Sequence, residues 1–285
     1  MEIENPMISV CMITYNHESF INEAIKGVFN QQVDFDVEFV ISNDCSTDDT
    51  HIIIEKLIAS NTKKNIRVSY FNQESNLGVM PNFVFALQQC SGKYIAICEG
   101  DDYWTDPLKL QKQVDFLENN PEFVVTYHNA KVLQNDRISK TNLIPEGRCE
   151  DFSKDQIKKG VWMPTLTRCF KNTIHLPEEF IKVNYGDFFL NCIYAEYGKA
   201  KYLDFVGAVY RKHDGGVHSS ITQIKNNLNL IHDFKIISRY YFNQNEKELS
   251  KYYKNRVKKE RNSLLKTIIK TRDLKSLGKF FGSYV

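Results

Sequence analysis

Short apolar runs alternate with amphipathic stretches along the first 120 residues of the chain. The apolar runs have the length of strands, and the stretches between them carry apolar residues at helical spacing. The expected strands are residues 8–14, 37–42, 66–71 and 93–98, and the expected helices are 20–29, 50–59, 80–90 and 107–119. Strands that alternate with helices through short loops predict a parallel sheet with helices on both faces.

The second half of the chain has a looser pattern. A further strand is expected at 123–128, and residues 134–152 are polar and predict a loop. The sequence Ser153-Lys154-Asp155-Gln156 is typical of a capping box at the start of a short helix. The remaining expected elements are a strand near 166–170, an apolar helix at 188–197, a strand at 202–210 and two long helices at 220–242 and 246–271.

The composition is that of an ordinary globular protein, with 42% hydrophobic and 25% charged residues. No run approaches the ~18 apolar residues of a membrane span, and residues 1–5 do not resemble a signal peptide, so we expect a cytoplasmic protein. The seven cysteines are odd in number and form no CxxC pair. They therefore argue against a disulfide framework or a zinc site, and we expect them in the core.

The charge is distributed unevenly. Residues 246–285 contain 12 Lys and Arg against 4 Asp and Glu, whereas the preceding residues contain 25 against 31. A basic helix with interleaved apolar residues can lie on an anionic surface, such as the inner face of the cell membrane. A solvated helix packed on the body, or a contact in a homo-oligomer, is the alternative. Nucleic acid is not expected, because the body is acidic and carries no recognition motif.

Acidic residues follow the apolar run 94–98. Glu99-Gly100-Asp101-Asp102 stands where a buried parallel strand reaches the carboxyl edge of its sheet, which is where open α/β sheets bind ligands. Neighbouring carboxylates repel each other unless a cation or a set of donors neutralises them. Mg²⁺ and Mn²⁺ bind one or two carboxylates together with phosphate oxygens. The alternative is a solvated turn before the helix that Asp106-Pro107 begins.

The other strand-to-helix loops should open on the same edge and form a pocket. They carry Thr14, Tyr15, Asn16, Asp44, Asn76 and Gly78. Phosphate-binding glycine motifs are absent, since the sequence has neither GxGxxG after the first strand nor a Walker A motif. An aromatic ring (Tyr15) can stack on a base, and a carboxylate (Asp44) can accept a hydrogen bond from a base N–H. This combination suits a nucleoside diphosphate held through its base and a metal ion.

Four segments in order resemble the successive motifs of the family 2 glycosyltransferases. They are ISVCMITYN at 8–16, NDCSTDD at 43–49, Asn76–Gly78 with Asn82, and EGDDYW at 99–104. The strong match covers about residues 7–120, and Gly186-Asp187 and YRKHDGGVHS at 210–219 match more loosely. The resemblance implies a GT-A-like α/β fold with a mostly parallel central sheet flanked by helices, and a helical C-terminal extension.

The resemblance also implies a division of the chain. Residues 1–218 would form the catalytic domain, with a nucleotide-binding half at 1–120 and an acceptor half at 121–218. Residues 219–285 would form the basic helical extension. The implied reaction uses a nucleotide-sugar donor and Mn²⁺ or Mg²⁺, and inverts the anomeric carbon.

Site roles follow from the resemblance position by position. Thr14, Tyr15 and Asp44 would contact the nucleoside, and Asp44 would read the base. Asp101 would face the ribose or the sugar, and Asp102 would ligate the metal. The family pattern is usually Asp-x-Asp, whereas Glu99 occupies the first acidic position here, so the three carboxylates remain alternatives for the metal and Asp102 is preferred.

The downstream motifs suggest the remaining roles. Asp187 matches the family's catalytic carboxylate, which would take the proton of the acceptor hydroxyl; the alternative is an acid that favours a helix N-terminus. Arg211 and His213 would bind the diphosphate, and His218 would complete the metal shell. The segment 162–165 would line the acceptor side, with a core aromatic as the alternative.

The sequence therefore predicts an inverting, metal-dependent glycosyltransferase. The expected transfer moves a hexose or N-acetylhexosamine from a UDP-linked donor to a surface-glycan or lipid-linked saccharide. One alternative is a sugar nucleotidyltransferase, which should need a glycine-rich, basic first loop that residues 14–17 do not provide. The other is a non-catalytic module that binds a nucleotide sugar or a glycan.

Overall fold

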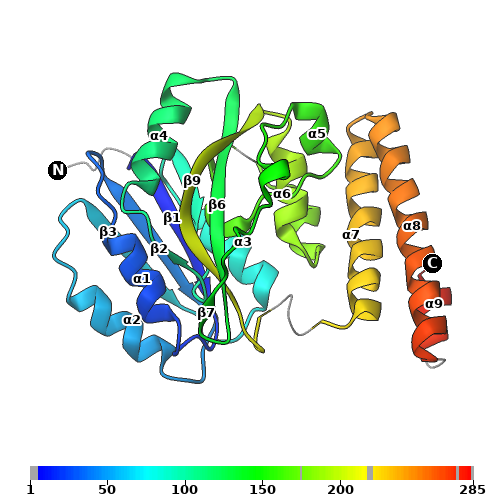
Figure 1. The fold of residues 1–285 in the computed structure, drawn as a ribbon, viewed down its shortest axis with the longest axis horizontal. Helices are drawn as coiled ribbons and strands as arrows, with labels where there is room; N and C mark the ends of the chain where they lie inside the picture. Colours follow the sequence, from blue (N-terminus) through cyan, green and yellow to red (C-terminus); the bar gives the residue numbers. More distant parts are fainter. Residues whose placement is uncertain (1–5, 174, 217–220, 274–275, 284–285) are drawn as a thin grey trace.

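A mixed sheet crosses the body of the protein, with helices on both of its faces (Figure 1). The computed structural model describes residues 6–173, 175–216, 221–273 and 276–283. Within these residues, nine strands form one sheet in the order β3-β2-β1-β4-β8-β6-β9-β5, and β7 pairs with β6.

The first half of the chain builds the parallel part of the sheet as expected. Its strands are β1 (Ile8–Thr14), β2 (Val37–Asn43), β3 (Ile66–Asn72) and β4 (Tyr94–Ile97). The helices between and after them are α1 (Ile21–Phe29), α2 (Thr50–Ala59), α3 (Val79–Gln89) and α4 (Lys109–Asn119). The four strands pair in parallel, so their carboxyl ends lie at one edge, where the predicted site residues were expected.

The second half adds two long strands and three short antiparallel ones. The long strands are β6 (Phe123–Gln134) and β9 (Lys199–Lys212), and the short ones are β5 (Tyr103–Trp104), β7 (Arg137–Ile138) and β8 (Cys169–Lys171). β6 and β9 are longer than their sequence patterns predict, because they pair in parallel with each other over most of their length. The prediction of a mostly parallel sheet flanked by helices is confirmed.

The segment between β7 and β9 is folded onto this frame by short helical elements. They are η1 (Glu146–Arg148), α5 (Lys154–Lys158), η2 (Thr165–Thr167), η3 (Glu178–Lys182) and α6 (Gly186–Tyr194). The predicted capping box at Ser153 is confirmed, because its side chain and that of Gln156 each accept the other's backbone N–H. The expected loop 134–152 is anchored by Asn129, whose side chain bonds both the N–H and the carbonyl of Ile144.

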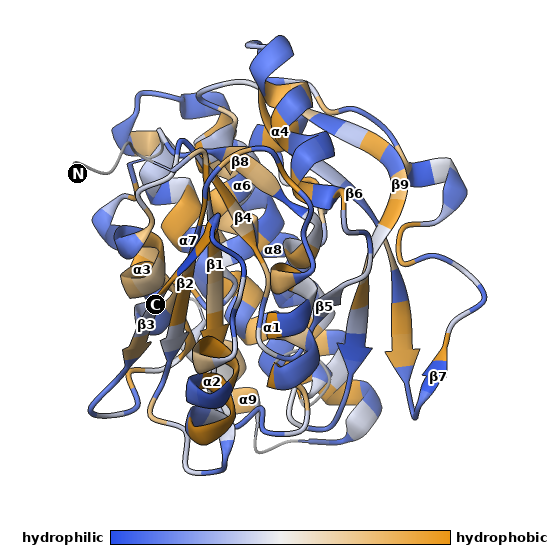
Figure 2. Ribbon diagram, turned by 90° about the vertical axis from the view of Figure 1, so that its left-hand side faces the viewer, coloured by the Kyte–Doolittle hydropathy of each residue, from blue (hydrophilic) through white to orange (hydrophobic). Residues whose placement is uncertain are grey.

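The core has two parts, one on each face of the sheet. One part includes α1, α4 and the alternate residues of β1 and β2 whose side chains point to that face. The other part includes α3, α6 and the C-terminal helices. Strands β1, β2 and β4 are mostly hydrophobic in Figure 2, as expected for strands covered on both faces. The seven cysteines are free, and five of them are buried in this core.

The C-terminal extension is helical, as predicted, and stands at one end of the body beside α6 (Figure 1). It comprises α7 (Gln223–Asn243), α8 (Lys247–Thr271) and α9 (Leu277–Gly282). The basic helix α8 buries an apolar face against α7, and Tyr253 on that face stacks on Tyr241 and donates to the carbonyl of Lys158. In the described chain, no helix has the length and hydropathy of a membrane span.

Candidate active site

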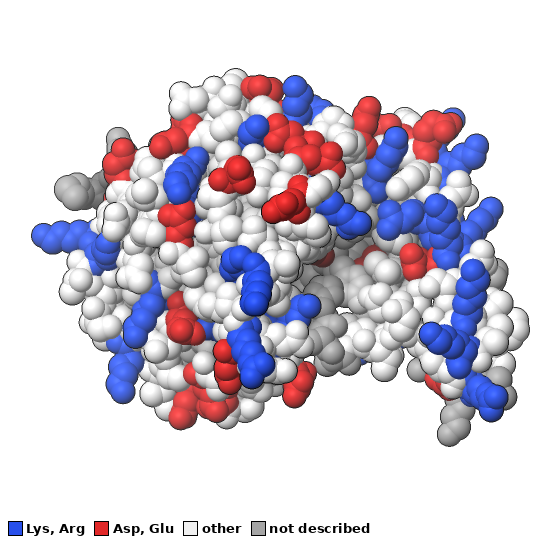
Figure 3. All heavy atoms as spheres, viewed as in Figure 1, with Lys and Arg blue, Asp and Glu red and all other residues white. Residues whose placement is uncertain are grey.

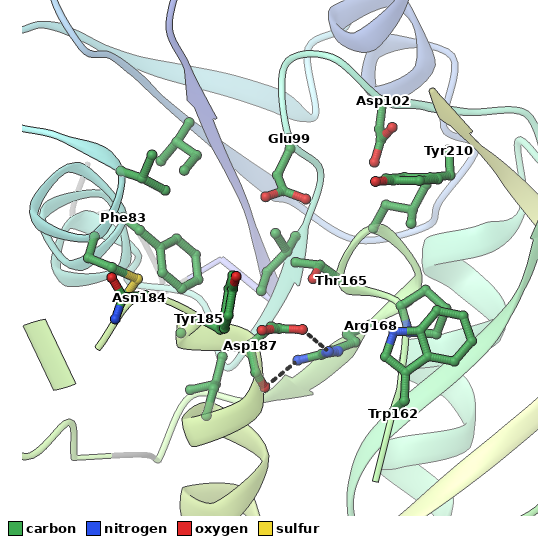
Figure 4. A pocket seen from close by; sticks show the side chains of 18 of the residues that line it. Phe83, Glu99, Asp102, Trp162, Thr165, Arg168, Asn184, Tyr185, Asp187 and Tyr210 are labelled. Atoms are coloured by element: carbon green, nitrogen blue, oxygen red, sulfur yellow. Dashed lines mark hydrogen bonds and ion pairs between the residues drawn. The ribbon is translucent and has the colours of Figure 1, made fainter. Parts of the chain in front are cut away.

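A cavity of about 370 Å³ lies at the carboxyl end of β4, between the sheet and the start of α6 (Figure 4). Its size is within the ~300–1,000 Å³ of small-molecule sites. Glu99 and Asp102 lie on one side of it, and Asp187 and Arg168 lie on the opposite side. Gly100 lets the acidic loop pass close to the end of β1, since a Cβ there would lie 2.6 Å from Thr14 Oγ1.

Two carboxyl groups of the acidic loop, those of Glu99 and Asp102, lie where ionisation is unfavourable. Asp102 is buried, and burial together with the neighbouring Asp101 and Glu99 raises its pKa well above the usual value. Burial, followed by the charges of Asp101 and Asp187, raises the pKa of Glu99 to about 8. One oxygen of Asp102 accepts the backbone N–H of Arg211 at 2.8 Å. The cavity therefore offers oxygen donors that a cation would stabilise in their charged form.

Asp101 faces two histidines. Its Oδ2 lies 3.1 Å from Nε2 of His213 and 4.0 Å from Nε2 of His17. Burial alone would raise the pKa of Asp101, but the hydrogen bond with His213 and the charge of His17 outweigh burial and lower that pKa. Asp101 is thus the carboxylate of the loop that stays ionised most readily.

Arg211 holds the acidic loop through contacts of its guanidinium group. Its guanidinium donates to the carbonyl of Asp101, pairs with Glu23 and lies over the ring of Tyr103, and the residue is 5% exposed. The neighbouring Lys212 lines the cavity. The two predicted diphosphate ligands of this strand end, Arg211 and His213, therefore both contact Asp101. The predicted metal ligand His218 lies outside the described residues.

Asp44 organises the loop that precedes α3. Its two carboxylate oxygens accept the backbone N–H groups of Leu77 at 2.7 Å and Gly78 at 2.9 Å, and Asn76 donates to its carbonyl. Gly78 adopts a φ of +89°, a conformation that favours glycine. Asp44 itself does not line the cavity, but Val79, which follows this loop, does.

Residues 14–16 lie at the carboxyl end of β1 and hydrogen-bond to the loop that follows β2. Thr14 is buried, and its hydroxyl lies 3.1 Å from Nδ1 of His17. Asn16 accepts the N–H of Thr47 at 2.8 Å and has a φ of +53°. These bonds fix the turn that presents Tyr15, whose side chain is 43% exposed. The exposed ring is available for stacking at the edge of the sheet.

Asp187 stands in the first turn of α6 and faces a buried arginine. The Nη2 atom of Arg168 lies 3.6 Å from its carboxylate, and Nη1 donates to its backbone carbonyl at 3.1 Å. Arg168 is fully buried and also donates through Nε to the carbonyl of Met163. Sequence reasoning did not find this residue. The available signal was a charged side chain within the apolar stretch 166–170.

Tyr210 of β9 was also not predicted as a site residue. It lines the cavity beside Asp102, and burial together with that carboxylate raises its pKa to about 12. By contrast, Trp104 packs in the core, where its indole N–H donates to the carbonyl of Leu166. Trp162, the other tryptophan, lines the cavity.

The chain is similar in sequence to proteins of one family. Residues 9–175 match the model of Glycosyl transferase family 2. An uncharacterised protein of Mycobacterium tuberculosis is 34% identical over 216 residues, which are 75% of this chain and 62% of that protein. The chain thus matches somewhat less than two thirds of that relative's length.

Two solved structures share the fold. Staphylococcus aureus TarS 1–349 in complex with UDP-GlcNAc has a TM-score of 0.56 and 22% identity, covering 82% of this chain and 71% of that one. The mannosyltransferase PcManGT from Pyrobaculum calidifontis, in complex with GDP-Man and Mn²⁺, has a TM-score of 0.58 and 15% identity, covering 96% and 81%. The fold is therefore GT-A-like, as predicted, and because the family match spans more than half of its residues the chain belongs to glycosyl transferase family 2.

Proposed function

We propose that this protein is an inverting, metal-dependent glycosyltransferase that moves a hexose or N-acetylhexosamine from a UDP-linked donor to a surface-glycan or lipid-linked saccharide. The observation that carries the proposal is the cavity in which Asp102 and Glu99 lie opposite Asp187. Membership of the family supports sugar transfer. The likeness to TarS with bound UDP-GlcNAc supports a UDP-linked donor.

In this proposal the nucleoside lies along the edge formed by residues 14–16, 44 and 76–78. The exposed ring of Tyr15 stacks on the base. Asp44 shapes the base pocket through its bonds to Leu77 and Gly78, and its oxygens keep lone pairs that can accept a base N–H. The diphosphate then extends toward Asp102 and Lys212 in the cavity.

Asp102 and Glu99 would hold the divalent cation. Among the described residues, no three His, Cys, Asp or Glu side chains form a complete metal site. Two carboxylates nevertheless suit Mn²⁺ or Mg²⁺, because these ions take their other ligands from diphosphate oxygens and water. When bound, the cation supplies charge stabilisation for the leaving diphosphate. The Mn²⁺ in the PcManGT structure supports this choice of cofactor.

Asp187 would accept the proton of the acceptor hydroxyl while that oxygen attacks the anomeric carbon from the side opposite the leaving group. Its carboxylate is partly exposed to the cavity, and Arg168 fixes its orientation through the backbone carbonyl and the ion pair.

Thermal shift with nucleotide sugars tests the proposal. We expect UDP-hexoses or UDP-N-acetylhexosamines to raise Tm by about 5 °C at 100 times Kd, with Mn²⁺ present and not with EDTA. UMP, which lacks the diphosphate, is the control. Stabilising donors should then be hydrolysed or transferred. Binding without turnover across donors and acceptors would favour the binding module, and turnover of a nucleoside triphosphate with a sugar phosphate would favour the nucleotidyltransferase.

We also propose that the outward face of α8 contacts an anionic membrane surface and brings the enzyme to lipid-linked acceptors. Lys and Arg side chains predominate over this helix in Figure 3. The exposed lysines of α8 are Lys247, Lys251, Lys254, Lys258, Lys259, Lys266 and Lys270. Because the apolar face of α8 is buried against α7, the contact would be electrostatic, with little insertion.

Vesicle binding checks this proposal. Changing Lys251, Lys254, Lys258 and Lys259 together to Gln should weaken binding to phosphatidylglycerol vesicles by about 1,000-fold, at ~1 kcal/mol per lysine. The matched control changes four exposed lysines of the body, Lys26, Lys56, Lys63 and Lys64, to Gln. High salt should release the unaltered protein. A protein that binds no vesicles even at low salt would exclude the membrane contact.

A further inference from the structure

The two tryptophans of the chain have opposite environments. Trp104 is 4% exposed, its indole N–H donates to Leu166, and the ammonium of Lys109 lies 3.8 Å from its ring centre. Trp162 is 52% exposed and lines the cavity, and among the described residues its indole N–H has no partner. A ligand that covered this large exposed ring would bury apolar surface, and that burial would favour binding.

The backbone on both sides of Trp162 is fixed. The carbonyl of Val161 accepts a hydrogen bond from the side chain of Asn191 at 2.9 Å. The carbonyl of Met163 accepts from Arg168, and the Met163 side chain is fully buried. The indole is therefore presented to the cavity by a segment whose neighbours are anchored in the core.

Arg168 connects the position of Trp162 with that of Asp187. It donates to the carbonyl next to Trp162 and to the backbone carbonyl of Asp187. Figure 4 shows the ring of Trp162 beside Arg168, on the side of the cavity away from Phe83. A ligand that rests on the indole therefore shares the cavity with the carboxylate that the proposed function assigns as the base.

We propose that Trp162 is the stacking platform of an acceptor subsite, and that this subsite takes a pyranose ring. The proposal rests on the proposed function and specifies the chemical class of its acceptor. A pyranose has an apolar face of C–H groups that packs on the face of an aromatic ring, and its hydroxyls can meet the free indole N–H and the polar walls.

Tryptophan fluorescence tests the subsite without requiring turnover. Because Trp104 is buried, acrylamide should quench Trp162 selectively in the wild-type protein. Methyl β-glycosides of glucose, galactose, mannose and N-acetylglucosamine are the probes, and sorbitol is the open-chain control. We expect at least one pyranoside to protect Trp162 from quenching, and no protection by sorbitol. Trp162→Phe should lose the quenchable signal.

Three results in that assay would overturn the proposal. One is quenching that no pyranoside reduces, and another is equal protection by sorbitol and the pyranosides. The third is protection by UDP with Mn²⁺, because the indole would then contact the nucleotide of the donor. The assay reports on the subsite even if no sugar transfer is found. Failure of the subsite proposal can therefore be distinguished from failure of the proposed function.

Kinetics of the transfer reaction provide the second readout. Trp162→Ala should raise the acceptor KM about tenfold and change the donor KM by less than about twofold. Trp162→Phe should restore most of the acceptor affinity because it keeps an aromatic face. Phe242→Ala is the matched control, since Phe242 is 58% exposed on α7 and does not line the cavity. Equal changes in donor and acceptor parameters would contradict an acceptor role.

Discussion

Replacing Asp187 by Asn is expected to lower kcat of sugar transfer by about 10²–10⁴-fold, the usual contribution of a general base. Asparagine has nearly the same size as aspartate but cannot take the proton of the acceptor hydroxyl. The backbone carbonyl of residue 187 would still accept from Arg168, so the start of α6 should keep its position. Binding of the donor, measured by thermal shift with Mn²⁺, should remain within about twofold of the wild-type value because it does not use the base.

The chain offers a matched control for this change. Asp155 is also the second residue of a helix, α5, and it is exposed away from the cavity. Asp155→Asn removes the same charge from a helix N-terminus and should leave transfer unchanged. Loss of activity in both variants would indicate a general effect of helix N-terminal charge. Full transfer activity in Asp187→Asn would remove Asp187 from the catalytic role.

Replacing Asp102 by Asn should weaken binding of the donor and increase the stability of the metal-free protein. We expect the Mn²⁺-dependent binding of the donor to weaken at least about 100-fold, because a carboxylate that holds the cation is lost. The metal-free variant should nevertheless have a higher Tm than the metal-free wild type at pH 7. Burial and the charges of Asp101 and Glu99 raise the pKa of Asp102, so keeping this group in the folded state costs stability at neutral pH. Asparagine removes that cost and keeps an oxygen that can accept the N–H of Arg211.

The pH dependence of Tm provides the control for the stabilising effect of Asp102→Asn. At a pH below the ordinary value of 3.8, Asp102 is protonated in both the folded and the unfolded wild type, so its titration contributes nothing. As the pH rises above that value, the unfolded state loses the proton first and the wild-type protein loses stability until the folded pKa is reached. The gap in Tm between variant and wild type should therefore widen from pH 4 to pH 8. If the difference in Tm does not depend on pH, the raised pKa of Asp102 does not explain the stability effect. If Mn²⁺-dependent binding of the donor is unchanged, another carboxylate holds the metal.

Much of the fold was predictable because local periodicity and short loops constrain it. The alternation of strands and helices in residues 8–119 predicts the parallel half of the sheet, and the observed strands lie within about two residues of the expected ones. The acidic loop at Glu99–Asp102 was predictable for the same reason, because the carboxyl end of a parallel strand has a defined place at the sheet edge. A strand near 166–170 was predicted, and β8 overlaps it, but its antiparallel pairing and the length of β6 and β9 were not predictable, because they depend on pairing between distant segments.

By itself, the sequence determined the class of the fold, the family and the acids at the end of β4, because these depend on residues that are close together in the chain. Only the tertiary structure decided what each side chain faces. It joined Arg168 to Asp187, aimed the guanidinium of Arg211 at Asp101, and gave the two tryptophans opposite environments. The physical reason is that burial and pKa are set by contacts between segments up to 188 residues apart, which no local pattern records.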